Sequence, residues 1–341
     1  MLTGRLPKAI LKWLGFSVGA RYLVTGAAGF IGARVSELLL DGGNTVVGVD
    51  NMNTSYDLRM KEYRLNKLKG REGFAFHRLD IADRKAAENL GSASIDAVIN
   101  LAARAGVRDS VEDPWVYLES NSTGTLNLLE LCRQCGIEKF VLASTSSIYG
   151  ANAPLPTAET ADSSHPLQPY AASKKGAEAM CHAYHFLYGM DVTVVRYFTV
   201  YGPAGRPNMS MFRFMQSISE GKPIQLLGDG NQTRGFTYID DIARGTILAV
   251  KPVGYEIVNL GGHESISINE LIEMLEKAIG RKAIIEQLPA EKADMSASWA
   301  DVSKAGKLLG WEPQVGLKDG IARMVEWYMA EHSWASKIKL D

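Results

Sequence analysis

The sequence predicts an α/β fold in which a doubly wound parallel sheet is followed by a smaller α/β lobe. In the first part of the chain, short apolar segments rich in β-branched residues alternate with helical patterns, as in parallel sheets covered by helices on both faces. A glycine-rich segment joins the first strand to the first helix. The chain has 341 residues, of which 46% are hydrophobic, so it can bury one large core and a smaller one.

The expected strands lie at residues 21–25, 45–49, 74–79, 97–101, 139–144 and 192–197. Two of the intervening helices are long, at 114–134 and 167–189. After residue 198 the chain is rich in Gly, Pro and Met, and shorter elements are expected at 210–220, 241–250, 267–279 and 317–331. We therefore expect an amino-terminal extension (1–20), a sheet domain (21–198) and a second lobe (199–341), with some segments of the lobe returning to the sheet domain.

Three glycines at intervals of three follow the first strand, in the segment TGAAGFIG that begins at Thr25. Gly26 permits a tight turn, Gly29 lets the backbone approach a pyrophosphate, and Gly32 lets the helix pack on the strand. The amino terminus of that helix then faces the anion. The second strand ends at Asp50, whose carboxylate is placed to accept the adenosine ribose hydroxyls and repels a 2′-phosphate. Since the next three residues include no Arg, NAD is favoured over NADP.

Tyr170 and Lys174 are four residues apart in the segment PYAASK, on one face of a helix. An ammonium there lowers the pKa of a phenol from its ordinary value of about 10 toward working pH. Taken alone, such a pair is more often an exposed helix pair. Beside a dinucleotide turn, it predicts a general base.

Composition excludes other classes of function. The net charge is −1 and the pI about 6.6, so we expect no nucleic-acid partner. Three cysteines leave one unpaired, which favours a reducing cytoplasm. Cys132 and Cys135 have no second pair at metal-ligand spacing, and Cys181, His182 and His185 share one helix, so we expect them to pack and to bind no metal.

Residues 1–18 precede the first strand and mix basic with apolar residues. We favour an extension without function, or an upstream start codon. A short basic amphipathic helix at a membrane surface stays open as an alternative. A signal peptide is disfavoured, because Lys12 interrupts the apolar part and cleavage after Ala20 leaves the fold to start at once.

Residues 21–331 resemble the extended short-chain dehydrogenase/reductase superfamily, and within it the nucleotide-sugar 4-epimerases, most closely UDP-glucuronate 4-epimerases. The resemblance rests, in family order, on TGAAGFIG, VDNMN, LDIAD, NLAARAGVR, STSSIYG, PYAASK, RYFTVYGPAGRP, RGFTYIDD and ADVSKAGKLLGW. It implies a Rossmann fold, bound NAD, a UDP-sugar substrate and a homodimer built from the two long helices.

The resemblance also implies roles for particular residues. Besides the glycines, Asp50, Tyr170 and Lys174, the implied cofactor-binding residues are Phe30, Ile31, Asn51, Asn53, Asp80, Ile81, Leu101, Ala102, Ala103, Asn121, Tyr197 and Phe198. The implied substrate-binding residues are Arg108, Ser146, Ser147, Thr199, Arg206, Gln225, Arg234 and Asp294.

The family mechanism fits these residues. Tyr170, as phenolate, removes the proton of the sugar 4-hydroxyl while hydride passes from C4 to NAD⁺; the 4-keto sugar rotates, and hydride returns to its other face. Thr145 corresponds to the residue that bonds the 4-oxygen, and Lys174 also holds the ribose. Related 4,6-dehydratases carry Asp-Glu where this chain has Ser146-Ser147, and related decarboxylases carry Glu at the second position. Both activities are therefore disfavoured.

The second lobe indicates the sugar. Thr199 stands where hexose-specific 4-epimerases usually carry Asn, and the Arg206 guanidinium suits a C6 carboxylate, although Arg206 also fits a role in tying down loop carbonyls. Three departures from the family pattern are Gly235, Arg104 and Glu291, the last of which weakens phosphate binding unless Lys292 compensates. The alternatives are a UDP-glucose or UDP-N-acetylglucosamine 4-epimerase, a net dehydrogenase, and a non-catalytic NAD-sensing module.

Overall fold

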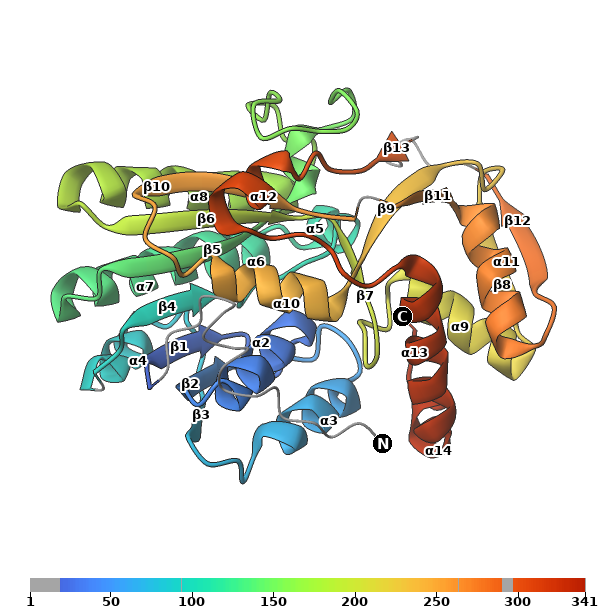
Figure 1. Cartoon of the computed structure of the whole chain (residues 1–341), viewed down its shortest axis with the longest axis horizontal. Coiled ribbons are helices and arrows are strands. Elements are labelled where there is room, and N and C mark those ends of the chain that lie inside the picture. Colours follow the sequence, from blue (N-terminus) through green and yellow to red (C-terminus); the bar gives the residue numbers. More distant parts are fainter. Residues whose placement is uncertain (1–18, 93, 263, 290–296, 341) are drawn as a thin grey trace.

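The computed structural model of the protein describes residues 19–92, 94–262, 264–289 and 297–340. In this part of the chain, seven parallel strands form one sheet in the order β10-β6-β5-β4-β1-β2-β3 (Figure 1). They are β1 (Arg21–Thr25), β2 (Thr45–Asp50), β3 (Phe74–Arg78), β4 (Ala97–Asn100), β5 (Lys139–Thr145), β6 (Asp191–Tyr197) and β10 (Tyr255–Leu260). The chain runs outward from β1 to β3 and then resumes on the other side of β1 with β4, so the predicted doubly wound sheet is confirmed.

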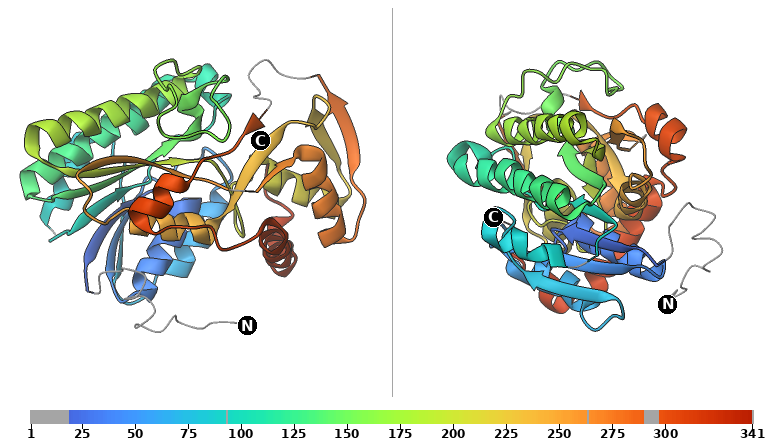
Figure 2. Two further views of the ribbon diagram at one scale, coloured as in Figure 1. Left: turned by 45° about the horizontal axis from the view of Figure 1, so that its top comes forward. Right: turned by 90° about the vertical axis from the view of Figure 1, so that its left-hand side faces the viewer.

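Helices cover both faces of this sheet (Figures 1 and 2). One face carries α2 (Phe30–Asp41), α10 (Ile239–Leu248) and α12 (Ser303–Leu309), and the other carries α7 (Gly124–Cys135) and α8 (Pro169–Tyr188). Neighbouring residues of β1 point to opposite faces, so that Val24 joins the core beneath α2 and Leu23 the core beneath α7 and α8. Burial on both faces explains why the strands read as continuous apolar runs.

Shorter segments complete the sheet domain. The helix α3 (Leu58–Leu68) leads from β2 to β3, and α4 (Arg84–Glu88) and η1 (Asn89–Ser92) lead from β3 to β4. After β4 come α5 (Asp109–Glu112), α6 (Trp115–Tyr117) and the π-helical segment η2 (Leu118–Thr123), which continues into α7. The helix expected at 114–134 is therefore present, with a widened turn in its first half.

The second lobe has its own sheet and core. Four strands, β7 (Thr199–Tyr201), β9 (Thr233–Tyr238), β11 (Ser265–Ser267) and β13 (Ala297–Ser298), pair around β9, and β8 (Pro223–Leu227) pairs with β12 (Ile284–Leu288). The helices are α9 (Ser210–Glu220), α11 (Ile268–Ile279), α13 (Leu317–Ala330) and α14 (His332–Ala335). Their apolar faces share one core, which includes Phe212, Met215, Leu271, Ile321 and Tyr328.

The helix expected at 241–250 lies in the sheet domain, not in the second lobe. Its counterpart α10 packs against α2, and Arg34 Nε of α2 donates to Asp240 Oδ1 at 2.7 Å. The next strand, β10, pairs in parallel with β6 at the edge of the sheet. Sequence periodicity showed that this helix has an apolar face but not which core that face joins.

Candidate active site

A cavity of about 800 Å³ lies between the carboxyl ends of the sheet strands and the second lobe. Its sheet-domain wall comes from segments that follow β1, β2, β4, β5 and β6, and its other wall from β7, α9, β8 and β9. The switch between β1 and β4 lies in this wall, which is where open α/β sheets bind ligands.

All but two of the residues expected to bind or react line this cavity. They are Gly26, Gly29, Phe30, Ile31, Gly32, Asp50, Asn51, Asn53, Asp80, Ile81, Leu101, Ala102, Ala103, Arg108, Thr145, Ser146, Ser147, Tyr170, Lys174, Tyr197, Phe198, Thr199, Arg206, Gln225 and Arg234. Of the two exceptions, Asn121 is buried behind the wall, and Asp294 lies outside the described residues. Also outside them are Glu291, Lys292 and residues 1–18, so the structure does not address the expectations for these positions.

The glycine turn between β1 and α2 leaves no room for side chains. A Cβ on Gly26 would lie 2.9 Å from the backbone of Leu101 and Ala102, and the φ of Gly26 is +67°. A Cβ on Gly32 would lie 2.1 Å from the carbonyl oxygen of Gly26. The turn therefore brings the amino terminus of α2 to the cavity with its backbone bare, as a pyrophosphate site requires.

Asp50 is 6% exposed at the end of β2, and its carboxylate accepts hydrogen bonds from two backbone N–H groups at 2.8 and 3.2 Å. The structure adds a buried cation that the sequence analysis missed: Lys61 Nζ of α3 lies 3.4 Å from Asp50 Oδ1 and 3.1 Å from Asn53 Oδ1. Nearby, Asn51 Nδ2 donates to Asp80 Oδ2 at 2.8 Å. A lysine eleven positions after the acid gives no sequence signal, because only the packing of α3 brings it back.

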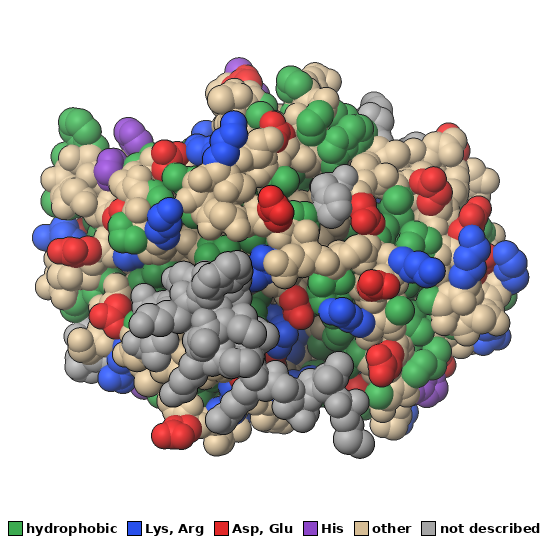
Figure 3. Space-filling model, viewed as in Figure 1, with side chains coloured by type: hydrophobic (Ala, Val, Ile, Leu, Met, Phe, Trp, Pro, Cys, Tyr) green, Lys and Arg blue, Asp and Glu red, His purple; other side chains and the backbone are tan. Residues whose placement is uncertain are grey.

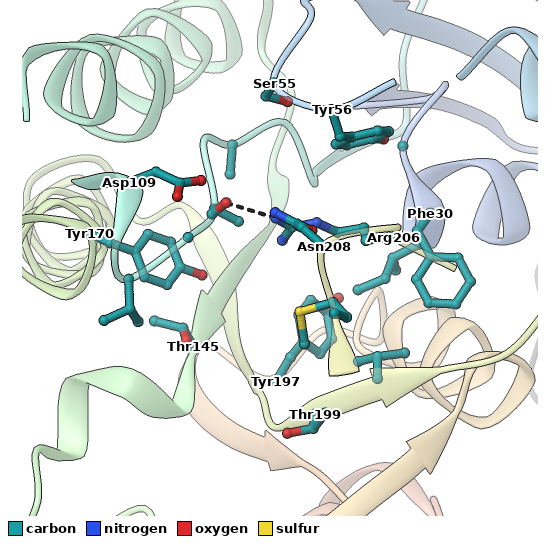
Figure 4. A pocket seen from close by; sticks show the side chains of 18 of the residues that line it. Phe30, Ser55, Tyr56, Asp109, Thr145, Tyr170, Tyr197, Thr199, Arg206 and Asn208 are labelled. Carbon is teal, nitrogen blue, oxygen red and sulfur yellow. Dashed lines mark hydrogen bonds between the residues drawn. The ribbon is translucent and has the colours of Figure 1, made fainter. Parts of the chain in front are cut away.

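Thr145 and Tyr170 reach the cavity from different elements (Figure 4). Thr145 ends β5, and its hydroxyl caps the short helix η3 (Ser146–Tyr149), accepting from Ser147 N at 3.2 Å. Tyr170 lies in the first turn of α8, and the ring of Tyr117 packs against it edge-on at 6.0 Å. In Figure 4 the phenol, the threonine and Arg206 all project into the same space.

The charges around Tyr170 differ from the expected arrangement. Burial raises the pKa of Tyr170, while its hydrogen bond to Thr145 and the charge of Arg206 lower that pKa. Lys174 instead donates to the carbonyl oxygen of Ala143 at 3.0 Å, and burial lowers the pKa of Lys174 to about 8. Arg206 thus lowers the pKa of the phenol in this structure, while the Lys174 ammonium is hydrogen-bonded to β5.

Arg206 and Asn208 carry polar atoms with no partner. Arg206 Nη2 donates to the carbonyl oxygen of Ala105 at 2.8 Å, so part of the side chain does tie down a loop. Arg206 Nε and Asn208 Oδ1 are buried with no hydrogen bond among the described residues. Both side chains line the cavity (Figure 4). Buried groups of this kind normally have partners, so a rotation of either side chain toward the cavity would let it bind a polar ligand.

The wall formed by the second lobe supplies further cations. Arg234 of β9 lines the cavity and donates from Nη1 to the carbonyl oxygen of Thr233 at 2.8 Å. Gln225 comes from β8. Arg213, which the sequence analysis missed, lines the cavity from α9 between the buried Phe212 and Phe214. A single basic residue within an otherwise apolar helical segment was the available signal.

Asn121 links two segments of the protein and does not itself line the cavity. Its side chain is fully buried in η2, accepts from Arg104 N at 2.9 Å, and donates to Arg104 O at 3.0 Å and Ser173 Oγ at 2.9 Å. It thereby joins the loop after β4 to α8. Asn121 lies within the π-helical turn of η2, and such π-turns often occur at functional sites.

Within the described ranges, no group of three or more His, Cys, Asp and Glu residues is arranged to hold a metal ion. Cys132 and Cys181 are buried in the core, and the rings of His182 and His185 contact Tyr255. None of the helices in the described part of the chain has the length and apolar character needed to cross a membrane. Acidic and basic side chains are interspersed on the face seen in Figure 3.

Comparison with known proteins shows likeness over nearly the whole chain. Residues 22–261 match the model of the NAD dependent epimerase/dehydratase family. A UDP-glucuronate 4-epimerase of Thermodesulfobacterium geofontis is 59% identical over 308 residues, which are 90% of this chain and 95% of that protein. A probable UDP-glucuronate 4-epimerase of Rhizobium meliloti is 40% identical over 329 residues, which are 90% of this chain and 96% of that protein.

Solved structures give the same result. The UDP-glucuronic acid 4-epimerase from Bacillus cereus, in complex with UDP-glucuronic acid and NAD, has a TM-score of 0.86 at 38% identity, covering 91% of this chain and 99% of its own. The UDP-glucose 4-epimerase from Thermotoga maritima, with UDP-glucose, has a TM-score of 0.85 at 33% identity, covering 92% of this chain and 99% of its own. The likeness therefore includes both lobes.

Proposed function

The chain belongs to the NAD dependent epimerase/dehydratase family, and on that premise we propose that it is a UDP-glucuronate 4-epimerase, which interconverts UDP-glucuronate and UDP-galacturonate. The observation that carries the choice of a uronate is the Arg206 guanidinium, which lines the same cavity as Thr145 and Tyr170. The similar proteins named above include UDP-glucuronate 4-epimerases, which supports this choice.

NAD fits the residues that are present. The bare turn at Gly26 and Gly32 matches the close approach of a pyrophosphate, and the Asp50 carboxylate at the end of β2 matches a ribose diol. Lys61, 3.4 Å from Asp50, adds a positive charge at the same place. When bound, NAD accepts hydride from C4 of the sugar and gives it back, so the reaction leaves no net redox change.

The chain's own residues supply the proton chemistry. Tyr170 takes the proton from the sugar 4-hydroxyl and Thr145 holds the 4-oxygen, since both side chains line the cavity and the Thr145 hydroxyl lowers the pKa of Tyr170. The charge of Arg206 favours the phenolate. Lys174 lies behind Tyr170 and is placed to bind the nicotinamide ribose when it turns away from Ala143.

The residues that line the cavity next to Thr145 explain which side reactions are avoided. Eliminating water across C5 and C6 needs an acid or base beside those carbons. The residues after Thr145 that line the cavity are Ser146 and Ser147, and Ser147 Oγ accepts a hydrogen bond from the Thr145 hydroxyl at 3.2 Å. Serine hydroxyls hold a carboxylate by hydrogen bonds but do not remove a proton from carbon.

We further propose where the substrate lies. Arg206 and Thr199, with the two serines, receive the sugar carboxylate, because a guanidinium pairs with a carboxylate through directed hydrogen bonds. Gln225 faces the uracil, and Arg234 and Arg213 face the diphosphate. Arg213 thereby supplies a second cation for the phosphates independently of Lys292. Arg108 and Asp294 keep the substrate-binding roles implied by the family resemblance.

The proposal also includes an oligomeric state and a cellular location. We infer a homodimer formed by α7 and α8, which present large apolar side chains to solvent, among them Phe186, which is 79% exposed. The others on these helices are Leu126, Leu187 and Tyr188. We also infer a cytoplasmic location, which the buried free cysteines Cys132 and Cys181 support. Light scattering of the purified protein tests the dimer.

One experiment tests the function. The purified protein is incubated without added NAD with UDP-glucuronate, UDP-glucose and UDP-N-acetylglucosamine in turn, and the products are identified. We expect UDP-galacturonate from the first substrate and much slower turnover of the other two. Accumulation of NADH in proportion to enzyme and substrate would show a dehydrogenase instead. Preference for either neutral sugar would favour the hexose 4-epimerase, the activity of the Thermotoga maritima protein.

A further inference from the structure

A buried ion pair lies directly behind the catalytic side chains and has no part in the chemistry proposed above. Glu178 of α8 and Arg196 of β6 are 2% and 1% exposed. Arg196 Nη2 lies 2.7 Å from Glu178 Oε2, and Arg196 Nε donates to Glu178 Oε1 at 3.0 Å. Ser144 Oγ of β5 donates to the same Oε1 at 2.6 Å. One carboxylate therefore joins a helix to two strands.

The register of the strands shows what this junction controls. Ser144 pairs with Arg196 across β5 and β6, and the next residues, Thr145 and Tyr197, pair with each other. Both of these next residues line the cavity. The Glu178 carboxylate is thus held by the two residues that immediately precede Thr145 and Tyr197, of which Ser144 also lines the cavity and Arg196 lies behind it.

On the helix side, Glu178 lies four residues after Lys174 and eight after Tyr170, so all three share one face of α8. Fixing the carboxylate fixes both the rotation of α8 and its position along the strands. Arg196 is itself held from the opposite side, where Nη1 donates to the hydroxyl of Tyr149 at 2.9 Å. The junction is therefore rigid on every side.

We propose that Glu178 is a positioning residue of the epimerase reaction: its carboxylate locks α8 to β5 and β6 and thereby holds Tyr170 and Lys174 opposite Thr145. The proposal rests on 4-epimerase chemistry at this site but not on the identity of the sugar. A buried ion pair is poor evidence for a stabilising role, because apolar replacements of such pairs are often neutral. Displacing a reacting group by about 1 Å, in contrast, can cost about 100-fold in rate.

The same carboxylate acts on the charge of Lys174. Burial lowers the pKa of Lys174 to about 8, and the negative charge of Glu178 opposes that change. The other titratable groups around Glu178 are Arg196 of β6, Lys175 and Cys181 of α8, Tyr149 of η3 and Tyr255 of β10. Without the carboxylate, Lys174 faces the unpaired charge of Arg196, so its pKa falls and its ammonium is lost at a lower pH.

Glu178→Gln tests the proposal, because it keeps the size of the side chain and removes its charge. The matched control is Asp191→Asn. Asp191 forms a partly buried ion pair with Lys139 at the opposite ends of the same two strands, away from the cavity. Each full-length variant is assayed with whichever of the three UDP-sugars the wild type converts. Failure of the wild type on UDP-glucuronate alone would therefore count against the proposed substrate and not against this proposal.

We expect Glu178→Gln to retain bound NAD and a nearly unchanged KM, to lose about 10- to 100-fold in kcat, and to lose activity at lower pH on the alkaline side. Asp191→Asn should lower the melting temperature while keeping kcat and its pH profile. Equal losses of kcat in the two variants, or a Glu178→Gln variant that melts early with normal kcat and pH profile, would show a purely structural ion pair.

A second variant keeps the test decisive if Glu178→Gln does not fold. Ser144→Ala removes only the hydrogen bond from β5 and leaves the ion pair in place. We expect it to fold normally and to lose about 2- to 10-fold in kcat with KM unchanged. A normal kcat in a well-folded Ser144→Ala protein would overturn the proposed link between β5 and α8.

Discussion

Replacing Arg206 by alanine should separate two effects of one guanidinium. The first effect is electrostatic: the charge of Arg206 lowers the pKa of Tyr170, so its loss should slow the reaction of every sugar. The second is direct, because the Arg206 guanidinium lines the cavity, where we propose that it donates to the sugar carboxylate. Only a uronate experiences the second effect.

The size of the second effect follows from the bond that is lost. A hydrogen bond to a charged group contributes about 1.5–3 kcal/mol, which corresponds to about 10- to 150-fold in kcat/KM. The first effect divides out when the kcat/KM of UDP-glucuronate is divided by that of UDP-glucose in the same variant. We therefore expect Arg206→Ala to lower this ratio by about 10- to 150-fold relative to wild type.

Steady-state kinetics with the two substrates measures the ratio, and two further variants serve as controls. Arg213→Ala removes a cation that we place at the diphosphate, so it should weaken both substrates equally and leave the ratio unchanged. Arg206→Lys keeps a positive charge near Tyr170 but changes the donor geometry, so it should recover the rate with UDP-glucose more than the rate with UDP-glucuronate. If Arg206→Ala depresses both substrates equally, Arg206 is structural or binds the diphosphate, and the hexose 4-epimerase becomes the better interpretation.

Four other predictions test the remaining parts of the site. Tyr170→Phe should lower kcat by at least about 100-fold while substrate still binds, and near-normal turnover would exclude Tyr170 as the base. Gly32→Ala should abolish NAD retention on purification, because its Cβ would lie 2.1 Å from the carbonyl oxygen of Gly26; normal NAD content would contradict the close packing of the turn. Burial lowers the pKa of Lys174 from 10.5 to about 8, so kcat should fall as pH rises through about 8, because the ammonium that we place at the nicotinamide ribose is then lost. The contribution of Lys174 to the free energy of unfolding should instead rise with pH between about 8 and 10.5, because the unfolded chain binds the proton more tightly there. Measurements of pH–rate profiles and of denaturant unfolding at each pH test the two trends, and flat profiles would argue against a lowered pKa. Deleting residues 1–18 should leave folding and activity unchanged, as β1 begins at Arg21, and lost turnover in the truncated protein would assign the extension a function.

The parts of the fold and site that could be predicted are those specified by local sequence. The six predicted strands begin and end within one residue of β1 to β6, because most of them are apolar runs rich in β-branched residues and bounded by polar residues or glycine. The glycine turn and Asp50 are encoded within 25 residues, from Gly26 to Asp50, so their meeting at one sheet edge followed from strand direction alone. Tyr170 and Lys174 share a helix face for the same local reason.

What could not be predicted depends on contacts between distant segments. Lys61 meets Asp50 because α3 folds back over the end of β2, and Arg213 reaches the cavity because the other face of α9 is buried in the second lobe. Some segments after residue 198 were expected to return to the sheet domain, but the sequence did not show that α10 is one of them. The apolar face of a helix does not indicate which core it joins. Each of these arrangements is decided by which cores are filled, which is a property of the whole chain.

By itself, the sequence determined the parallel sheet, the dinucleotide turn, the choice of NAD and the family to which the chain belongs, because hydrophobic periodicity and short motifs encode these features within a few turns or strands. Only the tertiary structure decided which charges and hydrogen bonds surround the catalytic side chains. It turned Lys174 toward Ala143, placed Arg206 as the cation that acts on Tyr170, and set the Glu178–Arg196 pair behind the cavity wall. The physical reason is that a pKa and a hydrogen-bond partner depend on burial and on separations of a few ångströms between segments far apart in the chain, which no local pattern specifies.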